Sequence, residues 1–228
     1  MRLTDIRKSY GERVVLDGLS LELAQGQITC ILGRSGAGKT TLLNILAGLL
    51  PYEGELLPVP AKVGYVFQDS RLLPHLTVRE NLLYVGGEEE RIERLLAEAG
   101  LAGLADRKAG GLSGGEKRRV AMLRAFCVDT ELVLLDEPFS ALDTVSKEQM
   151  MEMARTMLKA GGQAAVFVTH DLDEATRIAD TVAVLDGGRI AFQISLPCAN
   201  GLRGYAECPQ VREMLLQELK KTKDIGRI

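Results

Sequence analysis

Hydrophobic residues along the chain follow two spacings: short uninterrupted runs, and longer segments with helical periodicity. The runs "QITCIL" (27–32), "LVLL" (132–135) and "AAVFVT" (164–169) are typical of strands buried on both faces. In "EEERIERLLAEAG" (88–100), by contrast, apolar residues return every three or four positions and share one helical face. The alternation of such strands with helices predicts an α/β fold in which helices cover a parallel sheet.

The same periodicities place the individual elements. Strands are expected over 2–10, 14–24, 27–32, 62–68, 132–135, 164–169, 181–186 and 189–194. Helices are expected over 39–49, 77–85, 88–100, 120–128, 143–159, 172–179 and 210–221, with a loop at 196–209. Because 77–113 holds helical patterns without strands, we expect this block to form a separate lobe inserted into the α/β part.

The composition is that of an ordinary globular protein, with 46% hydrophobic and 26% charged residues in a chain of 228. Its 28 basic and 31 acidic side chains give a net charge of −3, which does not favour nucleic-acid binding. No apolar run approaches the roughly 18 residues of a membrane span. The N-terminus lacks the apolar core of a secretion signal, so we expect the chain to stay inside the cell.

Four cysteines are scattered without the spacing of metal ligands. Cys30 and Cys127 lie in apolar runs, so we expect them to be buried. Cys198 and Cys208 flank a loop and could pair in an oxidising compartment, but free thiols are favoured in a chain without a secretion signal.

The strongest chemical signal is "GRSGAGKTT" (33–41), which fits G-x-x-x-x-G-K-[ST] directly after a predicted strand and before a predicted helix. Glycines at these positions let main-chain N–H groups approach phosphate oxygens. Lys39 is expected to meet the β- and γ-phosphates, and the Thr40 hydroxyl to bind Mg²⁺. The predicted ATP-binding residues of this loop are Gly33, Arg34, Ser35, Gly36, Ala37, Gly38, Lys39, Thr40 and Thr41.

Two adjacent acids, Asp136 and Glu137, end the apolar run of "LVLLDEP". We expect Asp136 to bind Mg²⁺, often through water, and Glu137 to accept a proton from an attacking water. The alternative is a turn of two solvated acids before a proline, and the phosphate loop in the same chain argues against it.

A second glycine-rich stretch, "GGLSGGEKRR" (110–119), runs into the apolar segment "VAMLRAFCV". A glycine-lined helix start of this kind also suits an anion. One chain therefore contains two motifs suited to phosphate.

With these motifs in this order, the chain resembles the ATP-binding-cassette (ABC) ATPase subunits of membrane transporters, over about residues 1–195. "LSGGEKRR" is similar to the family's signature motif, with Glu116 where glutamine is usual. Gln68 in "GYVFQD" matches the Q-loop, "SALD" (140–143) the D-loop, and His170 in "VTHD" the switch histidine. Tyr10 stands where the family places an aromatic residue that stacks on adenine.

The resemblance implies a division of roles. The implied catalytic residues are Glu137, His170, Lys39 and Gln68, and the implied Mg²⁺ residues are Thr40, Gln68 and Asp136. In this family each ATP lies between two head-to-tail subunits, so Ser113, Gly114, Gly115, Glu116 and Asp143 would contact the ATP bound to a partner. Asp143 could serve as a helix N-cap as well.

Glu116 would bring a carboxylate close to that γ-phosphate. We therefore expect it to turn aside and pair with Lys117, Arg118 or Arg119.

The implied architecture is a P-loop NTPase core with a mixed sheet, an N-terminal antiparallel β-subdomain and an inserted α-helical subdomain. The RecA-like core would span about 1–72 and 119–195, the helical subdomain about 73–118, and a short C-terminal loop and helix 196–228. Implied partners are a second ATPase subunit, identical or paralogous, and permease subunits docked between the Q-loop and the helical subdomain. A solute-binding protein would complete the system, with the ATPase on the cytoplasmic face of the plasma membrane.

The implied function is to power the import of a small solute by ATP hydrolysis. The motifs and the helical tail are similar to those of subunits for nitrate, sulfonate, taurine or thiamine-related compounds. An exporter, a lipoprotein-release ATPase or a non-transport ABC ATPase are the alternatives. A DNA-maintenance ATPase would need a coiled coil between its two phosphate motifs, and a translation-type member would carry two cassettes. The cargo does not touch this subunit, so the sequence does not identify it.

Overall fold

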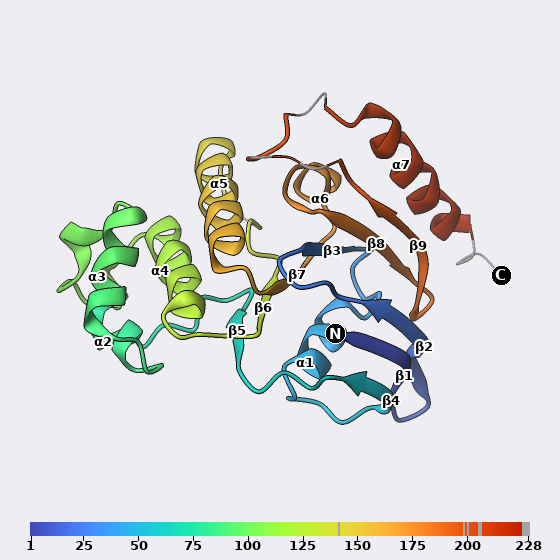
Figure 1. The fold of residues 1–228 in the computed structure, drawn as a ribbon, viewed down its shortest axis with the longest axis horizontal. Helices are drawn as coiled ribbons and strands as arrows, with labels where there is room; N and C mark the ends of the chain where they lie inside the picture. Colours follow the sequence, from blue (N-terminus) through green and yellow to red (C-terminus); the bar gives the residue numbers. More distant parts are fainter. Residues whose placement is uncertain (141, 198, 200, 205–206, 225–228) are drawn as a thin grey trace.

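Two β-sheets frame the molecule in the computed structural model, which describes residues 1–140, 142–197, 199, 201–204 and 207–224 (Figure 1). The smaller sheet is antiparallel, with strand order β2-β1-β4. The larger has the order β5-β6-β7-β3-β8-β9, in which β9 runs antiparallel to β8 and the other pairs are parallel. The predicted N-terminal antiparallel sheet and mixed main sheet are both confirmed.

The strands are β1 (Arg2–Tyr10), β2 (Arg13–Glu22), β3 (Ile28–Leu32), β4 (Glu53–Leu57), β5 (Val63–Val66), β6 (Leu132–Asp136), β7 (Ala164–Thr169), β8 (Thr181–Asp186) and β9 (Arg189–Ser195). The helices are α1 (Lys39–Leu46), α2 (Val78–Leu83), α3 (Glu89–Glu98), α4 (Gly114–Phe126), α5 (Thr144–Gly161), α6 (Leu172–Ile178) and α7 (Pro209–Asp224). Short 3₁₀ turns lie at Ala102–Leu104 and Ala109–Gly111. Within the described residues, no helix has the length and apolar character needed to cross a bilayer.

The strands of the main sheet divide their apolar side chains between two cores. On β6, Val133 and Leu135 pack with the helical side of the molecule, while Leu132 and Leu134 pack with α1 and the small sheet. This alternation follows from the two-residue period of a strand, and burial on both faces explains the uninterrupted apolar runs. Cys30 and Cys127 are buried as predicted, Cys208 is a half-buried free thiol, and Cys198 lies outside the described residues.

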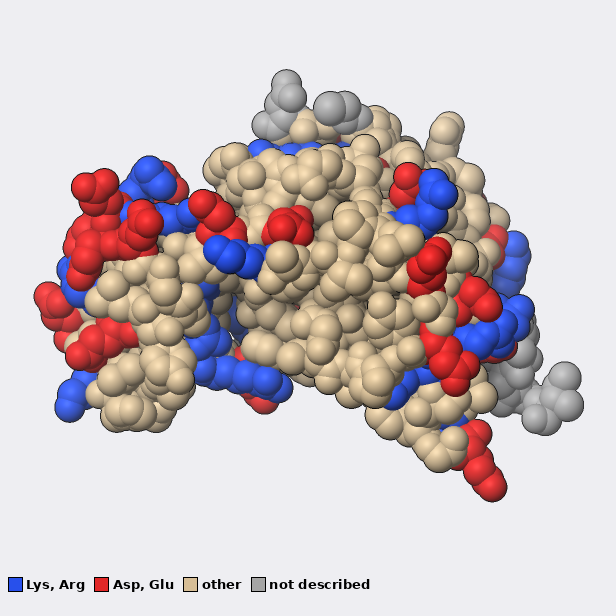
Figure 2. All heavy atoms as spheres, turned by 60° about the horizontal axis from the view of Figure 1, so that its bottom comes forward, with Lys and Arg blue, Asp and Glu red and all other residues tan. Residues whose placement is uncertain are grey.

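Helices α2, α3 and α4 stand together at the end of the molecule away from the small sheet (Figure 1). Acidic side chains gather over this end, with basic ones among them (Figure 2). Glu89 and Glu93 of α3 have side chains that are more than half exposed. Arg79 of α2 pairs with both of these glutamates, and its bond to Glu89 is 2.9 Å. These ion pairs therefore connect α2 to α3, while the two glutamate side chains also face solvent.

Strand β4 departs from the elements that the sequence predicts, which leave 50–61 without a strand. Its segment "PYEGELLPVP" contains three prolines and a glycine, residues that are depleted in strands. The strand forms because it pairs with β1 at the edge of the small sheet, where Gly54 has a φ of 103°. A Cβ at Gly54 would lie 2.4 Å from the carbonyl oxygen of Asp5, so the close approach needs glycine. Helix α1 also ends before the predicted residue 49, because Gly48 adopts a φ of 69°.

Gly64 provides a test of the contact between the main sheet and the helical lobe. A Cβ at this position on β5 would lie 2.4 Å from the carbonyl oxygen of Ala125 in α4. We expect Gly64→Ala to lower the free energy of unfolding by about 1–3 kcal/mol through overpacking, measured by urea denaturation. Gly103→Ala is the matched control, because its Cβ would meet nothing within 4 Å, and we expect a change of about 0.5 kcal/mol or less. Equal effects of the two variants would contradict this account.

Candidate active site

The loop between β3 and α1 closes around the side chain of Lys39. Its ammonium group donates to the main-chain oxygens of Gly33 at 2.8 Å and Arg34 at 3.0 Å, and only 6% of the side chain is exposed. Burial lowers the pKa of Lys39, while the nearby charges of Glu137 and Asp136 act in the opposite direction. The loop thus holds a largely desolvated positive charge at the start of a helix.

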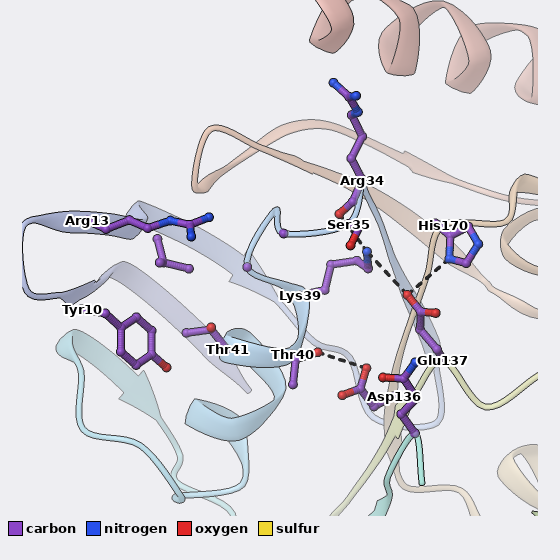
Figure 3. Close-up of a pocket in the computed structure, with 14 residues that line it drawn as sticks. Tyr10, Arg13, Arg34, Ser35, Lys39, Thr40, Thr41, Asp136, Glu137 and His170 are labelled. Atoms are coloured by element: carbon purple, nitrogen blue, oxygen red, sulfur yellow. Dashed lines mark hydrogen bonds and ion pairs between the residues drawn. The ribbon is translucent and has the colours of Figure 1, made fainter. Parts of the chain in front are cut away.

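Strand β6 brings the two predicted acids to this loop (Figure 3). Asp136 is buried and accepts a hydrogen bond of 3.3 Å from the Thr40 hydroxyl. Burial raises the pKa of Asp136, and the hydrogen bond from Thr40 opposes that shift. The Oε1 atom of Glu137 lies 3.9 Å from Nζ of Lys39 and 3.3 Å from Nδ1 of His170. Residues predicted from three separate motifs therefore meet at one place.

Glu137 has a left-handed backbone, with a φ of 44°, which is uncommon for a residue other than glycine. Its N–H donates to the carbonyl oxygen of Val168 at 3.1 Å, and its own carbonyl accepts from the Ser140 N–H at 3.2 Å and the Ser140 hydroxyl at 2.9 Å. Such a conformation costs on the order of 1–3 kcal/mol and persists only where its surroundings hold it. These contacts fix a turn from which the carboxylate faces Lys39 and His170 (Figure 3).

A pocket of about 830 Å³ opens above the loop. It is lined by Tyr10, Arg13, Val15, Arg34, Ser35, Gly36, Gly38, Lys39, Thr40, Thr41, Gln68, Asp136, Glu137 and His170. It thus unites the predicted ATP-binding, metal and catalytic residues, while Gly33 and Ala37 belong to the loop without lining the pocket. Tyr10 lies at the end of β1 and is half exposed, so its ring is accessible from this space.

Arg13 lines the same pocket and was not among the predicted residues. It pairs with Tyr10 across the β1–β2 hairpin, and its side chain points toward the phosphate loop (Figure 3). A Cβ on Gly36 would lie 4.0 Å from its Nη2 atom. The available signal was the hairpin itself, because a two-residue turn after Tyr10 makes Arg13 its cross-strand partner.

The predicted contacts to a partner's ATP, Ser113, Gly114, Gly115, Glu116 and Asp143, do not line this pocket. Ser113 is the N-cap of α4, where its hydroxyl accepts a 3.3 Å hydrogen bond from the N–H of Glu116. In return, the carboxylate of Glu116 accepts a 2.7 Å hydrogen bond from the N–H of Ser113. This reciprocal arrangement is a capping box.

The expected pairing of Glu116 with Lys117, Arg118 or Arg119 is corrected by this geometry. The carboxylate folds back on the main chain of its own helix start, because an N–H group without a helical partner is a closer donor. Arg118 instead donates to the main-chain oxygen of Gln68 and, at 3.3 Å, to that of Ser140.

Asp143 is the N-cap of α5, as predicted. Its carboxylate accepts hydrogen bonds from the N–H groups of Val145 at 3.1 Å and Ser146 at 3.0 Å.

A strand, a glycine-rich loop that encloses a lysine, and two carboxylates from a second strand of the same sheet define a P-loop nucleoside triphosphatase. Comparison with known proteins identifies the family within this class. The model of the ABC transporter family matches residues 16–140, and the chain belongs to this family. It is an ATP-binding and ATP-hydrolysing subunit whose activity is coupled to transport.

Several relatives match nearly the whole chain. The aliphatic sulfonates import ATP-binding protein SsuB 2 of Streptomyces avermitilis is 41% identical over 234 residues, covering 99% of this chain and 93% of that protein. SsuB 1 of Nocardia farcinica is 44% identical over 200 residues, covering 85% of this chain and 81% of that protein. A dimeric ATP-binding cassette solved in a post-hydrolysis state with ADP and Pi superposes with a TM-score of 0.74 at 30% identity, covering 87% of this chain and 99% of that one.

The capping box gives Glu116 a pH-dependent contribution to stability. Hydrogen bonds from Ser113 lower the pKa of Glu116 below its ordinary value of 4.5. A carboxyl group with a lowered native pKa stabilises the fold above its unfolded pKa, and this contribution is lost as the pH falls through the native value. We therefore expect wild type to be more stable than Glu116→Gln at pH 7, and the difference to shrink below about pH 4.5 in urea denaturation.

Glu80 provides a matched comparison, because it forms the same box with Thr77 at the start of α2 and its pKa is also lowered. Glu80→Gln should show the same trend. A stability difference for Glu116→Gln that stays constant across this pH range would rule out the ionised capping carboxylate.

Proposed function

We propose that this chain is the ATPase subunit of an importer of aliphatic sulfonates. The observation that supports this most is the 41% identity to a sulfonate import ATP-binding protein over 99% of the chain. The similarity extends beyond the nucleotide-binding motifs into the C-terminal residues, and several further relatives have the same import role in their names.

In this proposal the pocket residues act on ATP by position and charge. Tyr10 stacks on the adenine, the loop of residues 33–41 holds the phosphates, and Lys39 neutralises charge on the γ-phosphate. Glu137 accepts a proton from the attacking water, His170 contacts the γ-phosphate, and Gln68 orients the water. The 3.3 Å contact between Glu137 and His170 supports a shared task, since one carboxylate oxygen faces both the imidazole and Lys39.

The site also fits a magnesium ion. Mg²⁺ prefers oxygen ligands and is usually held by one or two carboxylates together with substrate phosphates. Thr40 and Asp136 place a hydroxyl and a buried carboxylate oxygen 3.3 Å apart, and Gln68 lines the same pocket. A bound Mg²⁺ would supply positive charge to the phosphates. It would also keep Asp136 ionised despite its burial.

The placement of the second motif outside the pocket supports a dimeric site. Ser113, Gly114, Gly115, Glu116 and Asp143 would face the ATP of a second subunit, identical or paralogous. The capping box is compatible with this role, because the Ser113 hydroxyl can turn its proton toward a phosphate oxygen while it accepts from the N–H of Glu116. Head-to-tail association would then complete two equivalent sites.

We propose that the chain is divided into a RecA-like core at about 1–72 and 119–195, a helical subdomain at about 73–118, and a C-terminal loop and helix at 196–228.

The partners of the chain follow from the importer role. Permease subunits would dock between Gln68 and the helical subdomain, and a solute-binding protein would deliver the cargo. The ATPase would lie on the cytoplasmic face of the membrane.

Replacing Glu137 tests the chemical step. We expect Glu137→Gln to lower ATP turnover by about 10²–10⁴-fold, because the amide no longer accepts the proton of water, while ATP-dependent dimers persist. Steady-state ATPase assays and size-exclusion chromatography with ATP measure the two effects. Lys39→Ala separates binding from chemistry, since it should weaken ATP binding itself in a direct titration. Near-wild-type turnover in Glu137→Gln would remove Glu137 from this role.

The cargo is tested in the assembled system. The chain is copurified with its membrane subunits, reconstituted in liposomes and supplied with the associated solute-binding protein. We expect ethanesulfonate to stimulate ATP hydrolysis, and nitrate or thiamine at the same concentration to leave it unchanged. Stimulation by nitrate or thiamine alone would assign another cargo, and stimulation without any binding protein would favour the exporter alternative.

A further inference from the structure

The ring of His170 is poorly supported by its own side-chain contacts. About 64% of the side chain is exposed, and its polar contact is the 3.3 Å approach to Glu137. The position of the imidazole therefore depends on the backbone between β7 and α6, where His170 lies between Thr169 and Asp171. Any group that fixes this backbone also fixes the ring.

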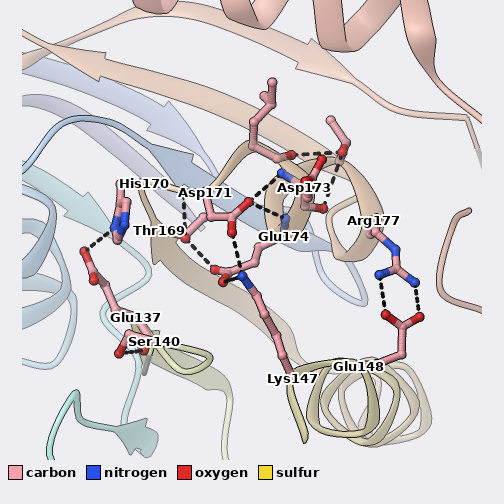
Figure 4. Close-up of polar contacts among 12 residues, drawn as sticks. Glu137, Ser140, Lys147, Glu148, Thr169, His170, Asp171, Asp173, Glu174 and Arg177 are labelled. Carbon is pink, nitrogen blue, oxygen red and sulfur yellow. Dashed lines mark hydrogen bonds and ion pairs between the residues drawn. The ribbon is translucent and has the colours of Figure 1, made fainter. Parts of the chain in front are cut away.

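Three polar side chains hold that backbone (Figure 4). The Thr169 hydroxyl accepts a 3.0 Å hydrogen bond from the N–H of Asp171 and donates one of 2.5 Å to Glu174. Asp171 is the N-cap of α6 and accepts from the N–H groups of Asp173 at 2.8 Å and Glu174 at 3.4 Å. The residues on both sides of His170 are thus tied to Glu174.

The charge that holds this cluster together comes from another helix. Lys147 lies in the first turn of α5, and its ammonium group is 2.5 Å from Asp171 Oδ2 and 2.6 Å from Glu174 Oε1. Only 5% of the Glu174 side chain is exposed, and its carboxylate lies close to that of Asp171. Without the lysine, a buried negative charge would face a like charge, so the loop would have to rearrange.

The turn before α5 connects this lysine to the edge of the active site. Asp143, the N-cap of α5, lies four residues before Lys147, so the two residues occupy one rigid helical turn. A small cavity of about 180 Å³ also lies between the turn before α5 and the loop that bears His170, and Glu137, Ser140, Lys147, His170 and Glu174 are among its lining residues. Of the three residues of the ion cluster, Lys147, Asp171 and Glu174, Lys147 is the one that belongs to α5, the helix capped by Asp143.

We propose that Lys147 is a positioning residue that couples the start of α5 to His170 through Asp171 and Glu174. This inference rests on the proposed roles of Asp143 and His170. A partner subunit that engages Asp143 would move the first turn of α5, and Lys147 would transmit that movement to the loop bearing the imidazole. The ion cluster thus makes the placement of His170 depend on subunit contact.

The chain offers a direct readout of His170, because it contains two histidines. Imidazole ¹H–¹³C NMR spectra of the full-length protein would show two signals, assigned with His75→Gln. His75 is exposed in the loop before α2, so its signal serves as an internal reference. We expect Lys147→Met to shift or broaden the His170 signal and leave that of His75 in place.

Lys159→Met is the matched control. Lys159 lies on the same helix and forms a similar ion pair, 2.6 Å from Asp180, but in the last turn of α5, at the opposite end from Lys147. Its substitution should leave the His170 signal and the turnover number unchanged. Lys147→Arg, which keeps the charge, should restore the wild-type signal. If Lys147→Met does not fold, Glu174→Gln provides the test, because it removes the charge that holds Lys147 while keeping an acceptor for Thr169.

Kinetics complete the test. We expect Lys147→Met to lower kcat by about 10- to 100-fold with little change in KM for ATP, and Lys147→Arg to recover most of it. An unmoved His170 signal in Lys147→Met or Glu174→Gln, or an effect equal to that of Lys159→Met, would overturn the proposal. Failure of the proposed function is seen separately, because it would appear as a lack of stimulation by ethanesulfonate in the reconstituted system and would not affect the NMR comparison.

Discussion

The buried ammonium group of Lys39 is the charge on which the geometry of the site depends. A lysine taken out of water needs partners for its donors, and the main-chain oxygens of Gly33 and Arg34 supply two. These oxygens converge because Gly36 and Gly38 adopt positive φ angles. Gly33 permits the same arrangement because it has no Cβ, which would lie only 2.8 Å from the Leu185 carbonyl oxygen. The loop, the strand beside it and the facing carboxylates are therefore arranged around one cation, in a pocket that suits polyphosphate.

The parts of the site that sequence predicts well are those encoded in short stretches. The residues from Gly33 to Thr41 have a fixed spacing and a fixed strand–helix context, and the acids at the end of β6 follow an apolar run that is unmistakable. The approach of the Arg13 side chain to the phosphate loop and the left-handed backbone of Glu137 are not local properties. Both depend on contacts with distant segments, as does β4, whose composition opposes a strand but whose pairing with β1 forms one.

The contact made by Glu116 follows from the local sequence pattern at the start of α4 and not from the charges of its neighbours. Three basic neighbours suggest ion pairs, yet the carboxylate binds the N–H of Ser113. The spacing Ser-x-x-Glu before a helix is itself the sequence pattern of a capping box, and the same pattern starts α2 at Thr77 and Glu80. A main-chain donor at a helix start is fixed in place, whereas flexible surface side chains lose conformational entropy on pairing. The more ordered donor therefore determines where the carboxylate lies.

Helix α6 is held at both ends, which gives the C-terminal residues a structural part in the site. Arg203 is buried and donates to the carbonyl oxygens of Thr176 at 3.4 Å and Ala179 at 2.5 Å, at the end of the helix. Arg212 of α7 pairs with Asp173 in its first turn. Because α6 begins directly after His170, these contacts and the Lys147 cluster act on the same rigid body. Arg203 and Arg212 thus help to set the orientation of the helix that follows His170, even though they lie outside the pocket.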